Sequence, residues 1–248
     1  MRLDQLLVDR GLVTSRNKAQ SLVMAGCVFE GEQRLDKPGQ MMPAGAIVVV
    51  RGPDHPWVSR GGVKLAHGIQ CFAMNSQGMI ALDVGTSTGG FTDVLLAGGA
   101  ARVYAVDVGY GQLAARLRLD PRVVVLERTN ARYLSQAHVP DPVDFVVCDA
   151  SFIGLRTVLP APLSLTRPGA RLLALIKPQF EVGREQVGRG GVVHDPRAQA
   201  MACARVTAWL AEQPGWRVLG VVESPLIGPN GNREFLVGAV RDDAPHCR

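Results

Sequence analysis

Hydrophobic residues in the first fifty positions follow a helical spacing and then a short-strand pattern. Leucines from Leu3 onward lie three and four residues apart, which marks one face of an amphipathic helix. A second helix is predicted to begin at Ser15, a suitable N-cap, and to end just before Gly26. Short apolar runs near 28–31 and 47–50 predict strands. The pattern therefore predicts a compact unit of two helices followed by short strands.

The segment Gly-Pro-Asp-His-Pro at 52–56 separates this unit from the rest of the chain. Two prolines and a glycine within five residues interrupt both helix and strand. We therefore expect an N-terminal domain at residues 1–51, a linker at 52–58 and a second domain at 59–248.

The second domain alternates apolar runs typical of strands with amphipathic runs typical of helices. The predicted strands lie near 80–84, 102–106, 122–126, 143–148, 171–176, 216–223 and 233–240. The predicted helices lie near 60–72, 90–98, 111–117, 155–165 and 196–212. Such alternation predicts a mostly parallel sheet with helices on both faces. Because no helix separates the last two strands, we expect the final strand to be antiparallel, in an α/β fold of seven strands.

The composition is that of a globular protein. Among 248 residues, 47% are hydrophobic and 20% are charged, and the formal net charge is +5. Five scattered cysteines without a C-x-x-C pair argue against a disulfide framework and a zinc site, so we expect no metal. No apolar stretch has membrane-spanning length and no signal peptide is visible, so we expect a cytoplasmic protein that does not enter membranes.

The strongest candidate for a ligand site is the segment L-D-V-G-T-S-T-G-G-F, from Leu82 to Phe91. A buried strand, a glycine turn and a helix start follow one another here, and a helix start offers free N–H groups. A second strand ends about twenty residues later at Asp107, where an acid can accept ribose hydroxyls. The predicted cofactor-binding residues are Asp83, Gly85, Thr86, Ser87, Gly89, Gly90, Phe91, Asp107 and Asp149.

The loop differs from the G-x-G-x-x-G pattern of dinucleotide-binding proteins. Its leading acid, Asp83, would repel a phosphate but suits a ligand that carries an ammonium group. S-adenosylmethionine has an ammonium, a sulfonium and an adenosine, and no phosphate. We therefore favour S-adenosylmethionine over NAD; an ordinary strand–helix turn without a ligand is the alternative.

Four charged residues are predicted to meet at the carboxyl edge of the sheet, where α/β proteins place their chemistry. Asp149 and Lys177 each follow an apolar strand directly, Glu234 begins the last strand, and Lys64 lies on the helix before the first strand. Burial and neighbouring charge could lower the pKa of one lysine, which could then accept a proton from a ribose hydroxyl. Any one of these residues alone could equally form a surface ion pair, so the set of four carries the prediction.

Basic residues lie near the predicted helix starts of the first domain, and any one of them alone could be an ordinary solvated surface charge. The patterns R-L-D-x-x-L, S-R-x-x-A, G-x-V and K-P-G resemble the S4-type RNA-binding module, although Glu30 replaces a usual asparagine. Because phosphates dominate RNA affinity, a binding face needs segregated cations. The candidate RNA-binding residues are Arg2, Arg10, Arg16, Lys18 and, from the second domain, Arg60. Residues 181–193, glycine-rich and basic, either close over RNA or form an ordinary surface loop.

The whole chain resembles the TlyA family, which joins an S4-like module to an FtsJ/RrmJ-type, Rossmann-like methyltransferase domain. The matching segments are V-S-R-G-G-V-K-L, L-D-V-G-T-S-T-G-G-F, C-D-A-S-F-I, L-I-K-P-Q-F-E and N-R-E-F-L. The resemblance implies S-adenosylmethionine-dependent 2′-O-methylation of cytidine in 16S and 23S ribosomal RNA. It also implies a catalytic tetrad of Lys64, Asp149, Lys177 and Glu234.

Two other functions remain open at this point. One is an RNA-binding protein whose methyltransferase fold is inactive. The other is membrane lysis, since members of this family have been called hemolysins, but no spanning or long amphipathic basic helix supports it. The expected partners are ribosomal RNA or ribosomal subunits, and we favour a monomer.

Overall fold

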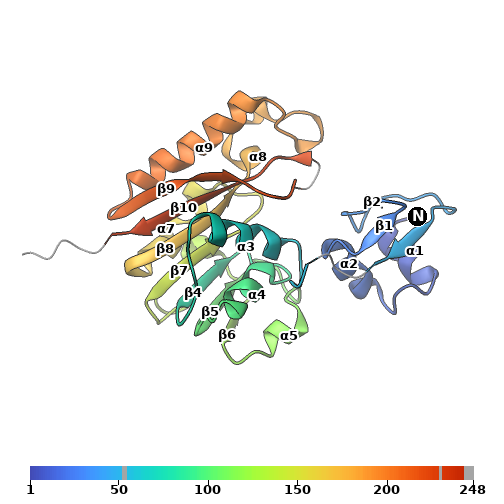
Figure 1. Ribbon diagram of the computed structural model, residues 1–248, viewed down its shortest axis with the longest axis horizontal. Helices are drawn as coiled ribbons and strands as arrows, with labels where there is room; N and C mark the ends of the chain where they lie inside the picture. Colours follow the sequence, from blue (N-terminus) through green and yellow to red (C-terminus); the bar gives the residue numbers. More distant parts are fainter. Residues whose placement is uncertain (52–54, 229–230, 243–248) are drawn as a thin grey trace, which may run out of the picture.

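The computed structural model describes residues 1–51, 55–228 and 231–242 of the chain. It consists of a small N-terminal unit and a larger unit built on one sheet (Figure 1). The first residues of the predicted linker and the centre of the turn before Glu234 lie outside the described residues. So does most of the C-terminal segment after 241.

The N-terminal unit has the predicted order of two helices and short strands. Its elements are α1 (Leu3–Asp9), α2 (Arg16–Met24), β1 (Val28–Glu30), β2 (Gln33–Arg34) and β3 (Val48–Val50). The strands form an antiparallel sheet in the order β2-β1-β3. Ser15 caps α2, since its Oγ accepts a hydrogen bond from Lys18 N at 3.2 Å. Leucines of α1 and valines of the sheet share one apolar core.

The larger unit is a seven-stranded sheet in the order β6-β5-β4-β7-β8-β10-β9. The strands are β4 (Ile80–Val84), β5 (Arg102–Val106), β6 (Val123–Leu126), β7 (Val143–Cys148), β8 (Thr166–Ile176), β9 (Trp216–Glu223) and β10 (Phe235–Arg241). Strands β4 to β8 pair in parallel, whereas β10 is antiparallel to both β8 and β9. The predicted mostly parallel sheet with an antiparallel last strand is confirmed.

Helices cover both faces of this sheet (Figure 1). One apolar cluster joins the sheet to α3 (Gly61–Cys71), α4 (Gly90–Ala97) and α5 (Ala115–Arg118). The other joins it to α6 (Leu155–Val158), α7 (Pro160–Ser164) and α9 (Pro196–Ala211). Alternation along β4 explains the division, because Ala81 faces the first cluster and Leu82 the second.

Several element boundaries differ from the sequence prediction. The helix predicted at 155–165 is two short helices, because Pro160 has no N–H to continue the first one. The helix predicted at 111–117 is reduced to α5, and β8 begins five residues earlier than predicted. A short helix after Lys177, α8 (Pro178–Glu181), is not in the prediction, since four residues carry no periodic signal. None of these differences moves the carboxyl edge of the sheet.

Candidate active site

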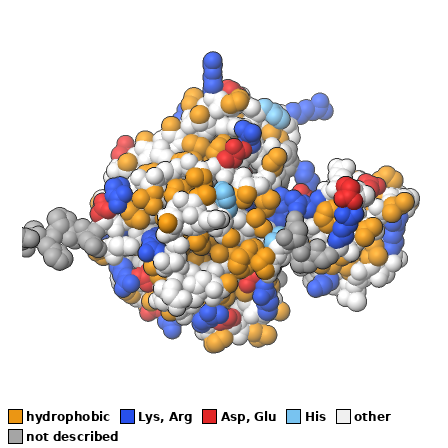
Figure 2. Space-filling model, in the orientation of Figure 1, with side chains coloured by type: hydrophobic (Ala, Val, Ile, Leu, Met, Phe, Trp, Pro, Cys, Tyr) orange, Lys and Arg blue, Asp and Glu red, His pale blue; other side chains and the backbone are white. Residues whose placement is uncertain are grey.

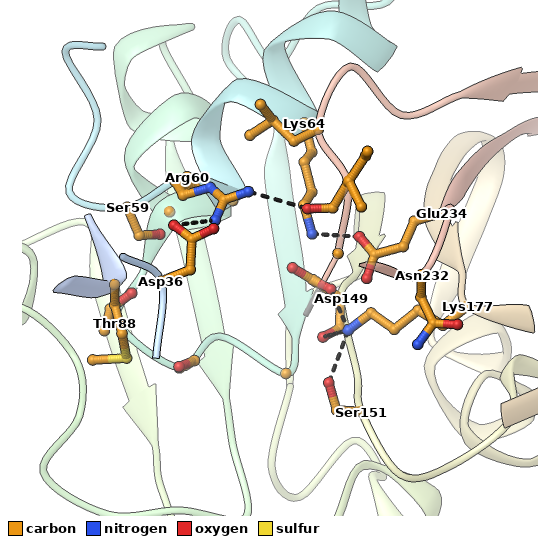
Figure 3. A pocket seen from close by; sticks show the side chains of 18 of the residues that line it. Asp36, Ser59, Arg60, Lys64, Thr88, Asp149, Ser151, Lys177, Asn232 and Glu234 are labelled. Atoms are coloured by element: carbon orange, nitrogen blue, oxygen red, sulfur yellow. Dashed lines mark hydrogen bonds and ion pairs between the residues drawn. The ribbon is translucent and has the colours of Figure 1, made fainter. Parts of the chain in front are cut away.

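The sheet brings three of the four candidate catalytic residues to one edge. Asp149 follows β7 and Lys177 follows β8, so both lie at the carboxyl end of a parallel strand. Glu234 precedes β10, and because β10 runs antiparallel, its beginning lies at the same edge. Phe235 pairs with Ile176, which places Glu234 beside Lys177. The fourth residue, Lys64, reaches the site from α3 (Figure 3).

Lys64 and Glu234 form a buried ion pair. Their Nζ and Oε2 atoms are 2.5 Å apart, and the two residues expose only 8% and 1% of their surface. Burying either the carboxylate or the ammonium without the other would lower the free energy of unfolding, because a single buried charge is not compensated. The second carboxylate oxygen of Glu234 has no hydrogen-bond partner among the described residues, so the pair keeps one acceptor near the cleft.

Lys177 has three oxygen atoms around its ammonium group. Its Nζ lies 2.6 Å from Asp149 Oδ1 and donates to Ser151 Oγ at 2.8 Å and to the Asp149 carbonyl at 3.2 Å (Figure 3). Ser151 is absent from the residues predicted for the site, although it belongs to the C-D-A-S-F-I motif. Its hydroxyl lines the cleft and holds the orientation of Lys177.

The electrostatics of this group correct one expectation. Burial lowers the pKa of Lys177, but Asp149 and Glu234 outweigh burial, and the pKa is raised above its ordinary value. Burial raises the pKa of Asp149, but Lys177 and Lys64 outweigh it, and this pKa is lowered. Lys177 is therefore a cation at neutral pH, and the lowered pKa that the sequence allowed for one lysine is not found at Lys177. Two carboxylates close to one ammonium stabilise its charge more than burial disfavours it.

A cleft of about 1060 Å³ joins these residues to the glycine loop. Six of the nine predicted cofactor residues line it: Gly85, Thr86, Ser87, Gly90, Phe91 and Asp149. The other three do not. Gly89 is the N-cap of α4. Asp107 lies beside the loop, where it accepts from Ser87 N, and Asp83 is fully buried beneath the loop.

The loop glycines are required by close packing against the protein itself. Gly85 has φ +82°, and a Cβ there would lie 2.9 Å from the backbone of Ala150. At Gly90, a Cβ would overlap the Ser59 hydroxyl and the backbone of Gly62. The glycines therefore bring the loop against α3 and the segment that carries Asp149. This packing is a reason for the glycines in addition to the close approach of a ligand predicted from sequence.

Three carboxylates surround the loop. Burial raises the pKa of Asp83 to about 7, and the nearby Asp149 and Asp107 add to the increase. Its Oδ2 accepts from Thr92 Oγ1 at 2.7 Å, while its Oδ1 has no hydrogen-bond partner among the described residues. Asp107 accepts from Ser87 N at 2.8 Å and Gly109 N at 2.6 Å and keeps lone pairs for other donors. Such a site repels phosphate and suits a nucleoside that carries positive charge.

The predicted RNA-binding residues of the N-terminal unit also hold that unit together. Arg2 and Arg16 bind the buried Asp4 at 3.0 and 2.9 Å, and their hydrogen bonds lower the pKa of its carboxyl. Arg10 donates to the carbonyls of Ala44, at 2.6 Å, and Ala46. The guanidinium groups of Arg2 and Arg16 are still about half exposed. Lys18 is exposed at the start of α2.

Arg60 joins the two units. Its guanidinium lies 2.7 Å from Asp36 of the N-terminal unit and donates to the Ile227 carbonyl at 3.1 Å (Figure 3). Arg34 and Lys37, which the sequence analysis did not select, line the cleft at this junction. Figure 2 shows Lys and Arg side chains where the two units meet. Lys37 belongs to the K-P-G motif, and this motif was the sequence signal from which its place at the cleft could have been predicted.

Two aromatic rings lie at the rim of the cleft. Phe152 is 91% exposed and has φ +66°, an unusual value for a bulky residue. Its ring centroid lies 5.4 Å from that of Phe180, and both residues line the cleft. An exposed, strained aromatic side chain at this place is a candidate contact for substrate. Sequence reasoning did not select Phe152, because exposure cannot be read from its neighbours.

No helix in the described ranges is long and apolar enough to cross a membrane. Within the same ranges, no group of three or more His, Cys, Asp or Glu side chains is arranged to hold a metal ion.

Comparison with known proteins agrees with this architecture. Residues 57–241 match the model of the FtsJ-like methyltransferases, and residues 1–48 match the S4 domain. The chain is 50% identical to the 16S/23S rRNA (cytidine-2′-O)-methyltransferase TlyA of Mycobacterium tuberculosis, over 95% of this chain and 88% of that protein. It is 47% identical to the YqxC protein of Bacillus subtilis, described as an rRNA methyltransferase, over 95% and 84% of the two chains.

A solved structure resembles the whole chain. A hemolysin-named protein from Streptococcus thermophilus superposes with a TM-score of 0.77 at 41% identity, covering 99% of this chain and 90% of that one. Extensive sequence identity, both matched domains and a shared fold give the same assignment. The chain therefore belongs to the FtsJ-like methyltransferase family, in the group of S4-domain proteins that includes TlyA.

Proposed function

We propose that this protein transfers a methyl group from S-adenosylmethionine to the 2′-hydroxyl of a cytidine in 16S and/or 23S ribosomal RNA. The observation that carries the proposal is the buried group of Lys64, Asp149, Lys177 and Glu234 in one cleft with the glycine loop. The substrate is taken from the relatives, since TlyA of M. tuberculosis is named for this reaction.

The acidic surroundings of the loop support S-adenosylmethionine as cofactor. Asp107 keeps lone pairs that suit ribose hydroxyls, and the carboxylate of Asp149 lines the cleft, where negative charge suits an ammonium or sulfonium. Thr86 and Ser87 offer polar groups along the same wall of the cleft. When bound there, the cofactor supplies an electrophilic methyl group.

The lysines and carboxylates then act on the ribose. Lys177, held by Asp149 and Ser151, exchanges its 3.2 Å hydrogen bond to the Asp149 carbonyl for one to the 2′-oxygen and so orients the lone pair of that oxygen. Since the raised pKa keeps Lys177 protonated, the proton lost by the hydroxyl passes to water rather than to this amine. Lys64 and Glu234 fix the position of the group. Alignment of this kind supplies a large share of the rate of such transfers.

RNA approaches from the junction of the two units. Arg34 and Lys37 at the rim of the cleft offer positive charge to phosphates, and Arg2, Arg16 and Lys18 extend it over the N-terminal unit. The exposed ring of Phe152 suits stacking on a base that has left its helix. These roles depend on the proposed substrate.

The decisive experiment is transfer of labelled methyl from S-adenosylmethionine to 30S and 50S subunits that lack the modification. We expect label on RNA, at a 2′-oxygen by mass spectrometry of nucleosides, and a loss of at least about 100-fold in Lys177→Ala. Arg217→Ala, which removes an exposed cation on β9, is the control and should behave as wild type. Cofactor binding without label on either subunit would support the inactive RNA-binding alternative instead.

A further inference from the structure

The glycine-rich segment at residues 183–193 forms part of the cleft wall. It follows α8 and includes two single turns, Arg184–Gln186 and Arg189–Gly191, with Arg184 and Arg189 exposed. Gly191 lines the cleft. Short turns rich in glycine have little intrinsic preference for one shape, so their position depends on contacts from elsewhere.

Two buried side-chain amides supply those contacts. Asn232 accepts from Val193 N through Oδ1 at 3.0 Å and donates through Nδ2 to the Gly191 carbonyl at 2.9 Å. Gln199, on the first turn of α9, donates through Nε2 to the Val193 carbonyl at 2.8 Å. Asn232 and Gln199 are 2% and 6% exposed. Backbone groups that would otherwise need water are satisfied by two fixed side chains.

Asn232 also links this segment to the catalytic group. It lies two residues before Glu234, and its carbonyl accepts from Gly228 N at 2.8 Å. Asn232 lines the same cleft as Glu234 and Lys177, and all three are labelled in the close-up view (Figure 3). One side chain therefore contacts the exposed arginine segment while its own backbone belongs to the loop that carries Glu234.

We propose that Asn232 and Gln199 are positioning residues that hold segment 183–193 as the RNA-side wall of the cleft, in register with Glu234. The proposal rests on the proposed function for its substrate, RNA. In this arrangement, RNA phosphates contact Arg184 and Arg189 while the ribose reaches the catalytic group. The two amides keep the distance between the arginine segment and the catalytic group constant.

Asn232→Asp and Gln199→Glu test the proposal, because each replaces an amide donor by a carboxylate of the same shape facing a carbonyl oxygen. Losing a buried hydrogen bond of this kind is expected to raise the KM for ribosomal subunits roughly tenfold in each variant. Trypsin should cut after Arg184 and Arg189 several times faster, and the Kd for S-adenosylmethionine should stay within about twofold of wild type. Gln213→Glu, which disturbs an amide–carbonyl bond at the other end of α9, is the matched control and should change none of these.

Three outcomes would overturn the proposal. Unchanged trypsin cleavage and unchanged KM in both variants would show that the amides do not hold the segment. A raised KM in Asn232→Asp alone would show that Asn232 contacts RNA itself. Loss of cofactor binding together with a fall in Tm would show a general structural role. If wild-type protein methylates no subunit, the proposed function fails. Trypsin cleavage of the variants still tests whether Asn232 and Gln199 hold segment 183–193.

Discussion

Asp83 shows most clearly how tertiary structure changes the chemistry of a single residue. The sequence places it at the end of a strand, next to a glycine loop, and suggests direct contact with an amine. In the structure it is fully buried beneath the loop, and burial raises its pKa to about 7. Its side chain is therefore separated from the cleft by protein and does not make the direct contact that the sequence suggests.

The raised pKa of Asp83 makes the stability of the cofactor-free protein depend on pH. Because the folded form binds a proton that the unfolded form releases, its contribution to stability falls as pH rises from about 4 to about 7. Asp83→Asn keeps the acceptor for Thr92 but has no charge to bury. We therefore expect urea denaturation to show the variant more stable than wild type at pH 8, by on the order of a few kcal/mol, and nearly equal at pH 4. A difference that is the same at both pH values would contradict this account.

Substitutions in the Lys64–Glu234 pair can separate its effect on methyl transfer from its effect on the free energy of unfolding. Lys64→Met leaves a buried carboxylate without its cation and should lower the free energy of unfolding by about 3–5 kcal/mol. Adding Glu234→Leu removes the uncompensated charge, so the double variant should recover much of that loss. Methyl transfer should stay abolished in both. Recovery of activity with stability would show that the pair only supports the fold.

At the level of elements, the site depends on where strands end. Parallel β7 and β8 and antiparallel β10 bring three of the four candidate catalytic side chains to one edge, where Phe235 pairs with Ile176. The glycine loop after β4 packs directly on the segment after β7, since Val84 pairs with Cys148. Cofactor loop and catalytic loop are therefore parts of one packed layer.

Gly85 tests this contact between the loops. In Gly85→Ala, the positive φ would be strained by roughly 1–2 kcal/mol and the new methyl group would also overlap the backbone of Ala150. Gly111→Ala is the matched control, because Gly111 has φ +70° and open space around it. We expect both variants to lose some stability in thermal unfolding, but only Gly85→Ala to lose cofactor binding by calorimetry. Equal loss of binding would mean that backbone strain alone explains the effect.

At the scale of the whole molecule, the cleft belongs to two units. The larger unit supplies the cofactor loop and the catalytic group, and the N-terminal unit supplies Arg34, Asp36 and Lys37 to the rim. Arg60 bridges them through Asp36 and the Ile227 carbonyl. The side chains of Arg60 and Asp36 are 17% and 39% exposed, and partly exposed ion pairs of this kind contribute little to stability. We therefore expect the bridge to affect the orientation of the two units more than their stability.

Salt dependence can separate the observed bridge of Arg60 from its proposed contact with RNA. Asp36→Asn breaks the bridge but leaves the cation, whereas Arg60→Gln removes both. If Arg60 also contacts a phosphate, the slope of log K for RNA binding against log salt should fall by about one unit in Arg60→Gln only. We expect this result, with weaker RNA binding in both variants by filter binding. Identical slopes in all three proteins would limit Arg60 to the bridge.

The sequence by itself determined the order of elements, the mostly parallel sheet and the four charged residues that meet at its edge, because apolar periodicity and strand-end charges are local signals. It also contained Ser151 and Lys177 within recognisable motifs. Only the tertiary structure decided the protonation of Lys177, since that depends on Asp149 and Glu234, which are distant in the chain. The same holds for the burial of Asp83, the exposure of Phe152 and the contact of Asn232 with Gly191. Burial and electrostatics arise from residues that meet only after folding, and spacing along the chain does not encode them directly.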